Sequence, residues 1–388
     1  MIYNSLIRNE DVYNKIISFS NLNRLPNAFI FYGNDGTGKE GHAIEFSAFL
    51  NCKKPFDDDS CGTCSSCLKI KNLQHEYLRI ILPLPKSKSL TKNDNPLKAL
   101  NSKQLESLEK KLKDKGSNPY ANIEFKTANT IIINSIREIK KELNLSIEEK
   151  CTRIFIIIQA EKLCYPNNES ANALLKILEE PPPNNLFILI TSDISKMIDT
   201  IISRCITIFF PTINKKKIQK FLSEIDVSKN DSEIISNISD GNIKKSLVLI
   251  NEIKEIDSLI RGLIQYILNQ NLTFLKDSID SFDKKNIAVD NLKYFNLFFR
   301  DLLIYKKTTN KAEINFIHYE KEIISIIKSY PNINWEECIS VTNNTQKYFI
   351  KNGNPSLLIT ALFLEYKKII NKNYYNTNIL EDWLNYPV

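Results

Sequence analysis

Continuous apolar runs alternate with helix-like periodicities along the first 210 residues of the chain. The apolar runs predict buried strands, because a strand covered on both faces needs no polar side. Segments with apolar residues at helical spacing separate them, and strands that alternate with helices imply a parallel sheet with right-handed crossovers. The predicted strands are 28–32, 77–82, 153–158, 186–190 and 206–210, and the predicted helices are 10–24, 41–50, 131–145 and 166–180.

The pattern changes after Pro211, where no further strong strand candidate occurs. Short helices are expected at 215–222, 231–238 and 243–253, followed by long apolar-periodic stretches to the end of the chain. Their aromatic residues fall at helical spacings, so we expect them in a core and not on a base-stacking surface. The predicted fold class is α/β followed by all-α.

Composition narrows the class of protein. A length of 388 residues suggests two or three domains, and 43% hydrophobic with 25% charged residues is ordinary for a globular protein. No apolar run approaches the roughly 20 residues of a membrane span. The N-terminal residues lack a signal-peptide pattern, so a cytoplasmic protein is expected. The net charge of +7 permits contact with nucleic acid but does not indicate it.

A glycine-rich turn that ends in lysine, GNDGTGKE at 33–40, follows the first predicted strand. Strand, turn and helix match the phosphate-binding loop pattern GxxxxGK[ST], in which glycines let backbone N–H groups point at phosphates. Glu40 stands where a Ser or Thr hydroxyl should hold Mg²⁺, so we expect ATP binding to be weak or absent. The predicted nucleotide-binding residues are Gly33, Gly36, Gly38 and Lys39.

Four of the eight cysteines lie within 16 positions. The spacing C-x₈-C-x₂-C-x₂-C is typical of a tetrahedral zinc site with a structural role. Polar residues between the cysteines argue against the alternative of four reduced core cysteines. A nearby His75 could compete as a ligand, but we expect it to be an ordinary surface histidine. The predicted zinc ligands are Cys52, Cys61, Cys64 and Cys67.

Residues 83–130 look like an insertion, rich in Pro, Ser, Asn and Lys, with one predicted helix near 101–115. Between Pro85 and Gly116 there are nine lysines and four acidic residues. The segment is either an arm that contacts DNA or a partner, or a solvated, mobile excursion, and we favour the second on general grounds. Thr130, just after it, is expected to cap the next helix.

Two motifs in the second half of the predicted sheet region carry a resemblance. Residues 170–182 read SANALLKILEEPP and residues 200–205 read TIISRC. They resemble the ANALLKxLEEPP and TIxSRC motifs of the clamp-loader AAA+ proteins of bacterial replication, and the cysteine cluster after the phosphate-loop helix fits the same family. The resemblance is strong over about 20–210 and weaker beyond, where NPSLL at 354–358 resembles the family's NPxLL.

The resemblance implies three domains. Residues 1–211 would form an AAA+ P-loop parallel sheet that carries the zinc module at 52–67 and the insertion at 83–130. Residues 212–253 would form a small helical lid, and residues 254–388 a helical collar that joins subunits.

Within this family, the resemblance leaves two kinds of subunit to choose from: an ATP-hydrolysing motor of gamma/tau type, and a delta-prime type whose nucleotide site is often degraded. The family's second-metal strand ends in DEA, whereas this chain has Ile158, Gln159 and Ala160, so the metal-organising Asp and the base Glu are absent. Lys244 is the best match to the lid arginine that senses the γ-phosphate. The resemblance therefore implies a delta-prime-like subunit without ATPase activity of its own.

Arg204 of the SRC motif is implied to act as an arginine finger on a neighbouring subunit's ATP, and the alternative is a structural arginine ion-paired at a helix end. The implied partners are gamma/tau and delta subunits and, through the complex, the sliding clamp and primer–template DNA, with no membrane. Three alternatives stay open: an active motor subunit, a stand-alone P-loop kinase or nucleotide-binding regulator, and a zinc-dependent nucleic-acid-binding protein.

Overall fold

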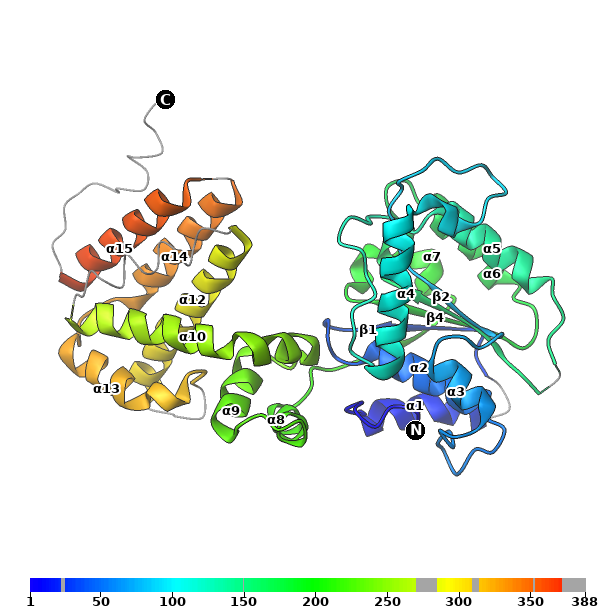
Figure 1. Cartoon of the computed structure of the whole chain (residues 1–388), viewed down its shortest axis with the longest axis horizontal. Helices are drawn as coiled ribbons and strands as arrows, with labels where there is room; N and C mark the ends of the chain where they lie inside the picture. Colours follow the sequence, from blue (N-terminus) through cyan, green and yellow to red (C-terminus); the bar gives the residue numbers. More distant parts are fainter. Residues whose placement is uncertain (22–24, 149, 270–284, 309–313, 352, 372–388) are drawn as a thin grey trace. The chain divides into compact units, whose positions relative to one another are not determined.

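The structure is a computed structural model and describes residues 1–21, 25–148, 150–269, 285–308, 314–351 and 353–371 (Figure 1). They divide into two compact units. The N-terminal unit is Met1–Phe221 with Asp240–Lys245, and the C-terminal unit is Leu222–Ser239 with the chain from Ser246 onward. Within the described ranges, no helix combines the length and the apolar character that a membrane span requires.

A five-stranded parallel sheet in the order β2-β3-β4-β1-β5 forms the centre of the N-terminal unit. All five strands lie within two residues of the predicted segments, which confirms the predictions. Because parallel strands end at the same edge, the phosphate-loop sequence after β1, Gln159 after β3 and Thr191 at the end of β4 meet there. The strands are β1 (Ala28–Tyr32), β2 (Leu78–Ile81), β3 (Arg153–Ile158), β4 (Asn185–Thr191) and β5 (Ile206–Phe209).

Helices cover both faces of the sheet, which explains why the strands are apolar throughout (Figure 1). Successive side chains of β1 point to opposite faces. Phe29 packs edge-on against Phe46 of α2, with ring centroids 6.1 Å apart. Ile30 belongs to the core on the other face, together with Ile136 of α5 and Leu174 of α6.

The helices of the N-terminal unit include three that carry or approach the phosphate loop, namely α2, α4 and the first residues of α10. Their bounds, with those of the remaining helices, are α1 (Glu10–Asn21), α2 (Lys39–Leu50), α3 (Ser65–Lys71), η1 (Pro96–Ala99), α4 (Ser102–Ser117), α5 (Ile133–Leu143), η2 (Ala160–Leu163), α6 (Glu169–Glu179), η3 (Ile194–Lys196), α7 (Asp199–Ile202), α8 (Lys215–Glu224) and α10 (Ile243–Asn269). Helices α8 and α10 continue into the C-terminal unit.

The described part of the C-terminal unit is helical and has an aromatic core. Phe299 of α12 stacks on Trp335 of α14, with centroids 6.1 Å apart, and meets Tyr366 of α15 edge-on at 5.1 Å. These aromatic side chains are buried, which confirms the predicted core role. The other helices there are α9 (Lys229–Ile238), α12 (Lys285–Thr308), η5 (Ile317–Tyr319), α13 (Glu320–Ser329), α14 (Trp335–Ile350) and α15 (Pro355–Asn371).

The fold class, α/β followed by all-α, is therefore confirmed. One local prediction is wrong. Thr130 does not cap α5, whose N-cap residue is Ile132 without a side-chain hydrogen bond. The Thr130 hydroxyl instead donates to the carbonyl oxygen of Tyr165 at 2.6 Å, a tertiary partner 35 positions away.

Candidate functional site: a phosphate loop filled by its own side chains

The predicted phosphate-binding loop lies between β1 and α2, and its glycines are required by the backbone. Gly33 has φ of 138°, and a Cβ there would approach the carbonyl oxygen of Phe210 to 2.3 Å. Gly36 has φ of 70°, and a Cβ there would overlap the side chain of Asn242. The glycines are thus required by close packing against Phe210, just after β5, and against Asn242, just before α10, whether or not a ligand is bound.

Lys39, the predicted phosphate-binding lysine, forms hydrogen bonds with the backbone of its own loop. The Lys39 ammonium donates hydrogen bonds to the carbonyl oxygens of Gly33 at 2.6 Å and Asn34 at 2.5 Å. Burial lowers the pKa of Lys39 to about 8, while Asp35 and Glu40 act in the opposite direction. The backbone N–H of Gly36 is also engaged, because it donates to the carboxylate of Asp35 at 2.8 Å. Groups that would bind phosphates therefore bind parts of the loop.

Glu40, the residue that breaks the loop pattern, forms a buried ion cluster with two lysines. Its carboxylate pairs with Lys115 from α4 and lies 3.1 Å from the ammonium of Lys244. Lys244 also lies 3.2 Å from Asp35. Burial alone would raise the pKa of the Glu40 carboxyl, but the charges of Lys115 and Lys244 lower it to about 2. Glu40 is therefore ionised at neutral pH.

Little space is left at the loop. The cavity beside it measures about 10 Å³, which is room for roughly one water molecule. The cavity is lined by Asp35, Gly36, Gly38, Lys39, Glu40, Pro119, Tyr120 and Lys244.

The strand that should carry the catalytic acids has none at the expected positions. Ile158 is buried at the end of β3, and Gln159 follows it with φ of 54°. The Gln159 Oε1 atom is buried and has no hydrogen-bond partner among the described residues. Glu161 is the nearest carboxylate in sequence, and it accepts a hydrogen bond from the Thr191 hydroxyl at 2.6 Å. Glu161 and Thr191 thus satisfy one another across the strand ends.

Lys115 is a site residue that was not predicted from the sequence. It is completely buried, donates to the carbonyl oxygen of Ala121 at 3.0 Å, and lies on the same helix face as Leu108 and Leu112. A lysine at helical spacing behind two leucines was the available signal, since such a residue has to find a buried anion. The expectation that residues 83–130 are a solvated, mobile excursion is wrong for this part, because α4 and the following turn pack against the phosphate loop.

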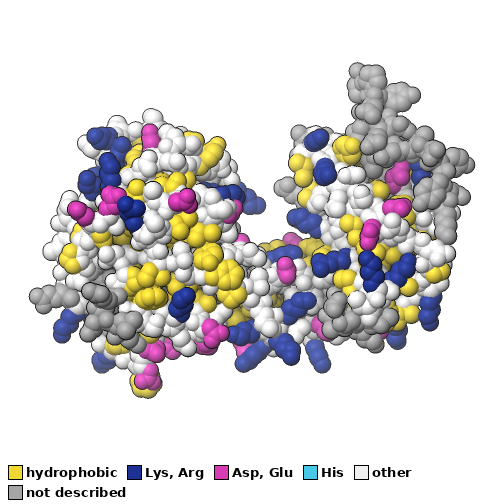
Figure 2. Space-filling view, turned by 180° about the vertical axis from the view of Figure 1, so that it is seen from behind, with side chains coloured by type: hydrophobic (Ala, Val, Ile, Leu, Met, Phe, Trp, Pro, Cys, Tyr) yellow, Lys and Arg dark blue, Asp and Glu magenta, His cyan; other side chains and the backbone are white. Residues whose placement is uncertain are grey.

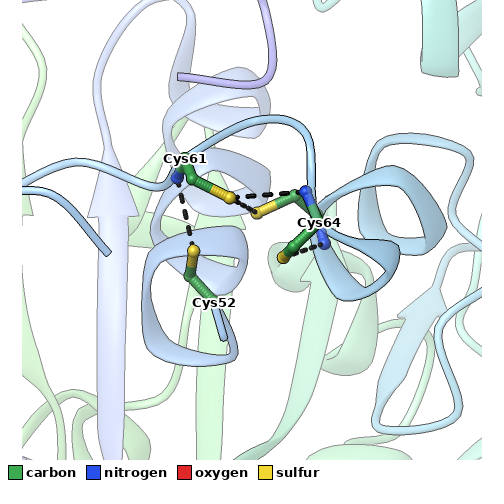
Figure 3. Close-up of side chains that lie close together, drawn as sticks. Cys52, Cys61 and Cys64 are labelled. Atoms are coloured by element: carbon green, nitrogen blue, oxygen red, sulfur yellow. Dashed lines mark hydrogen bonds between the residues drawn. The ribbon is translucent and has the colours of Figure 1, made fainter. Parts of the chain in front are cut away.

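The four clustered cysteines have the geometry of a metal site. Figure 3 labels three of them, Cys52, Cys61 and Cys64. One sulfur atom from each lies within 4.8 Å of the others, and the Sγ atoms of Cys61 and Cys67 are 3.9 Å apart. Tetrahedral Zn–S bonds of about 2.3 Å place sulfur atoms at nearly this separation. The N–H of Cys61 donates to the Sγ of Cys52 at 3.3 Å, and the N–H of Cys64 to the Sγ of Cys61 at 3.3 Å. These four residues fit a structural zinc site, in which protein ligands fill all four coordination positions.

The prediction for His75 is wrong. It is neither a fifth candidate ligand nor a surface residue, because it is buried and lies outside the sulfur cluster. Its Nε2 forms a hydrogen bond with the Ser66 hydroxyl at 2.9 Å, and its Nδ1 accepts one from the N–H of Tyr77 at 3.2 Å. His75 therefore joins α3 to the start of β2.

Arg204 lies between α7 and β5, and its side chain is 36% exposed. Its guanidinium pairs with Glu179 of α6 at 3.0 Å and donates to the carbonyl oxygen of Thr200 at 2.9 Å.

Lys and Arg side chains are mixed with acidic and apolar ones over the face seen in Figure 2. The positive charge is thus not gathered into one patch on that face.

A parallel sheet with a glycine loop and helix after β1, followed by a helical region, defines a P-loop protein of the AAA+ class. The chain belongs to the family described as DNA polymerase III, delta subunit, whose model matches residues 8–214, more than half of the sequence.

Relatives with three different subunit names are similar to the chain. The Bacillus subtilis DNA polymerase III subunit delta' is 24% identical over 286 residues, 72% of each chain. The gamma subunit of Buchnera aphidicola subsp. Baizongia pistaciae is 22% identical over 85% of this chain and 78% of its own length. The Bacillus subtilis tau subunit is 24% identical over 73% of this chain and 46% of its own length. The comparison supports a clamp-loader subunit family without separating these kinds.

Among solved structures, a gamma subunit-related protein of Thermotoga maritima aligns over 93% of this chain and 99% of its own, with 15% identity and a TM-score of 0.38. The Bacillus subtilis clamp loader delta protein aligns over 91% of this chain and 98% of its own, with 11% identity and a TM-score of 0.32. These overall similarities are weak, and the family assignment does not rest on them.

Proposed function

We propose that the chain is the delta-prime-like subunit of a DNA polymerase III clamp loader: a stationary subunit that has no ATPase activity of its own and helps load the sliding clamp on primed DNA. The observation that carries this proposal is the phosphate loop filled by Lys39, Glu40, Lys115 and Lys244. Phosphoryl transfer depends on metal ions and positioning, and the positions for both are taken by side chains of the chain itself.

In this proposal the subunit consists of an AAA+ domain at 1–211, a lid at 212–253 and a collar at 254–388, and acts in the cytoplasm. It binds one structural zinc ion through the four clustered cysteines and binds ATP weakly or not at all. Its partners are gamma/tau and delta subunits, and through them the clamp and primer–template DNA.

Arg204 is proposed to reach the ATP of a neighbouring subunit and to stabilise charge that develops in the transition state. Its present partner Glu179 does not prevent this. Both side chains are partly exposed, at 36% and 46%, and an exposed ion pair contributes only about 0–1 kcal/mol. Releasing the guanidinium therefore costs little.

The test uses the loader reconstituted with cognate motor and delta subunits, clamp and primed DNA. Arg204→Ala should lower DNA-dependent ATP turnover of the complex by about tenfold or more. Glu179→Ala, which removes only the ion-pair partner, should leave turnover near the wild-type value. Arg261→Ala is the matched control, because Arg261 is also an exposed arginine paired with an acid, Asp257. Equal turnover in Arg204→Ala and wild type contradicts the finger.

The second candidate is an ATP-hydrolysing motor subunit, which is supported by the gamma and tau relatives and their coverage of this chain. The isolated chain distinguishes the two. ATP turnover by the purified protein that disappears in Lys39→Ala would establish the motor and exclude the stationary subunit. A stand-alone P-loop kinase would instead transfer phosphate to a small molecule without any partner.

A further inference from the structure

The lysine that pairs with Glu40 is held from several sides. The Lys115 side chain is completely buried, and its ammonium contacts the Glu40 carboxylate and the carbonyl oxygen of Ala121. The backbone carbonyl of Lys115 accepts a hydrogen bond from the Tyr3 hydroxyl at 2.9 Å, and the Tyr120 hydroxyl accepts one from the N–H of Ile7 at 2.8 Å. The end of α4 is therefore fastened to the N-terminal segment as well as to the phosphate loop.

In P-loop proteins, a metal ion normally lies near the position that the Lys115 ammonium occupies here. The residue after the loop lysine normally offers a hydroxyl to a metal ion that also binds phosphate oxygens. Here that residue is Glu40, and its carboxylate faces the ammonium of Lys115. The Lys115 ammonium thus lies near where a P-loop protein would have a metal ion, and the Glu40 carboxylate is its counter-charge.

The start of α10 is fastened by the same carboxylate. Lys244 reaches Glu40 and Asp35, the N–H of Ile243 donates to the carbonyl oxygen of Gly36 at 3.1 Å, and Asn242 packs on Gly36. A phosphate would be the anion that attracts a lysine at this position in a nucleotide-bound protein. In this chain, the carboxylates of Asp35 and Glu40 pair with Lys244 instead.

We propose that Glu40, Lys115 and Lys244 form a built-in replacement for bound nucleotide and metal, and that the inserted segment 83–130 supplies the plug that keeps the phosphate loop ordered without a ligand. Because this follows from contacts inside the N-terminal unit, it does not depend on the proposed role in a clamp loader. Removing one member leaves a buried charge without its partner, which is far more costly than removing a whole pair.

Hydrogen exchange of the full chain, read by mass spectrometry on peptides that cover 33–42 and 240–245, tests this proposal. The wild type should be protected at these peptides without nucleotide, and addition of millimolar ATP with Mg²⁺ should leave the exchange unchanged. Glu40→Gln should speed exchange there by about a hundredfold, because Lys115 becomes an uncompensated charge. The double variant Glu40→Gln/Lys115→Met should exchange more slowly than Glu40→Gln alone.

Glu109→Gln is the matched control, because it makes the same charge change on the exposed side of α4. Lys244→Met keeps the test valid if Glu40→Gln does not fold, and it should also speed exchange at both peptides. Slower exchange of the wild type with ATP and Mg²⁺ would overturn the proposal, as would wild-type exchange in both Glu40→Gln and Lys244→Met. Slower exchange with ATP and Mg²⁺ would also contradict the weak ATP binding of the proposed function, whereas wild-type exchange in both variants would contradict only the present proposal. The Arg204 test in the assembled loader is independent of both outcomes, so the two failures can be told apart.

Discussion

The Nδ1 atom of His42 lies 2.8 Å from the carbonyl oxygen of Gly38, in the last turn of the phosphate loop. The opposite ring atom, Nε2, accepts a hydrogen bond from the backbone N–H of Asn9 at 3.1 Å. A carbonyl can only accept and an amide N–H can only donate, so the buried ring is neutral with its proton on Nδ1. Protonation of Nε2 would break the bond to Asn9.

This geometry makes the N-terminal unit sensitive to acid. Burial lowers the pKa of His42 to about 4, from 6.5 in an exposed histidine. Between these values the unfolded chain binds more protons, so stability falls as the pH falls through this window. We expect His42 to cost about 2 kcal/mol between pH 7.5 and pH 5.

Urea unfolding at both pH values measures this effect, and His42→Gln should show less of the loss. His318→Gln, in the C-terminal unit, is the control and should show the full wild-type loss. An undiminished loss in His42→Gln would contradict the assignment.

Asp301 gives the C-terminal unit the opposite pH dependence. Its buried carboxylate accepts bonds from the N–H groups of Asn315 at 3.0 Å and Phe316 at 2.8 Å. Burial raises its pKa to about 6, so the folded state takes up a proton before the unfolded chain does. The stabilisation is complete below about pH 4 and is lost as the pH rises through 6.

We therefore expect the C-terminal unit to gain about 1 kcal/mol when the pH falls from 7 to 5. Fluorescence of Trp335, which is buried in this unit, follows its unfolding. Asp301→Asn should remove the gain, whereas Asp290→Asn, at an exposed position on the same helix, should keep it. A gain that persists in Asp301→Asn would show that another group is responsible.

Lys39 should matter for stability and not for turnover. In Lys39→Met the carbonyl oxygens of Gly33 and Asn34 lose a charged donor, which should destabilise the N-terminal unit by about 1–3 kcal/mol. The ATP turnover of a loader that contains this variant should equal that of the wild type. Urea unfolding and the turnover assay measure the two effects, and Lys113→Met on the exposed side of α4 is the control. A loss of turnover without a loss of stability would assign Lys39 to nucleotide binding.

Zinc should be present at one ion per chain. Elemental analysis of the purified protein should show this stoichiometry, and Cys64→Ser should lower it and destabilise the N-terminal unit, because Cys64 both belongs to the sulfur cluster and caps α3. Cys151→Ser, outside the cluster, should keep the full zinc content. A wild-type protein without stoichiometric zinc would exclude the metal site.

The strands were predictable because their signal is local. Every residue of β3 and β4 is buried, and a run such as Arg153–Ile158 has no polar face that could compete with a central strand position. The sulfur cluster was predictable for a related reason, since three of its cysteines lie within seven positions and only Cys52 comes from the preceding helix end. His75 and Thr130 were mispredicted because their partners, Ser66 and Tyr165, lie outside the local patterns used to judge them.

The sequence by itself determined the class of this protein: a phosphate loop with a defect at Glu40, a strand without catalytic acids at Ile158 and Gln159, and motifs that resemble clamp-loader proteins. Only the tertiary structure decided what compensates the defect. Lys115 and Glu40 are 75 positions apart, and their pairing depends on where the inserted helix packs. A buried charge has to find its counter-charge in space, and no local pattern of residues records which one that is.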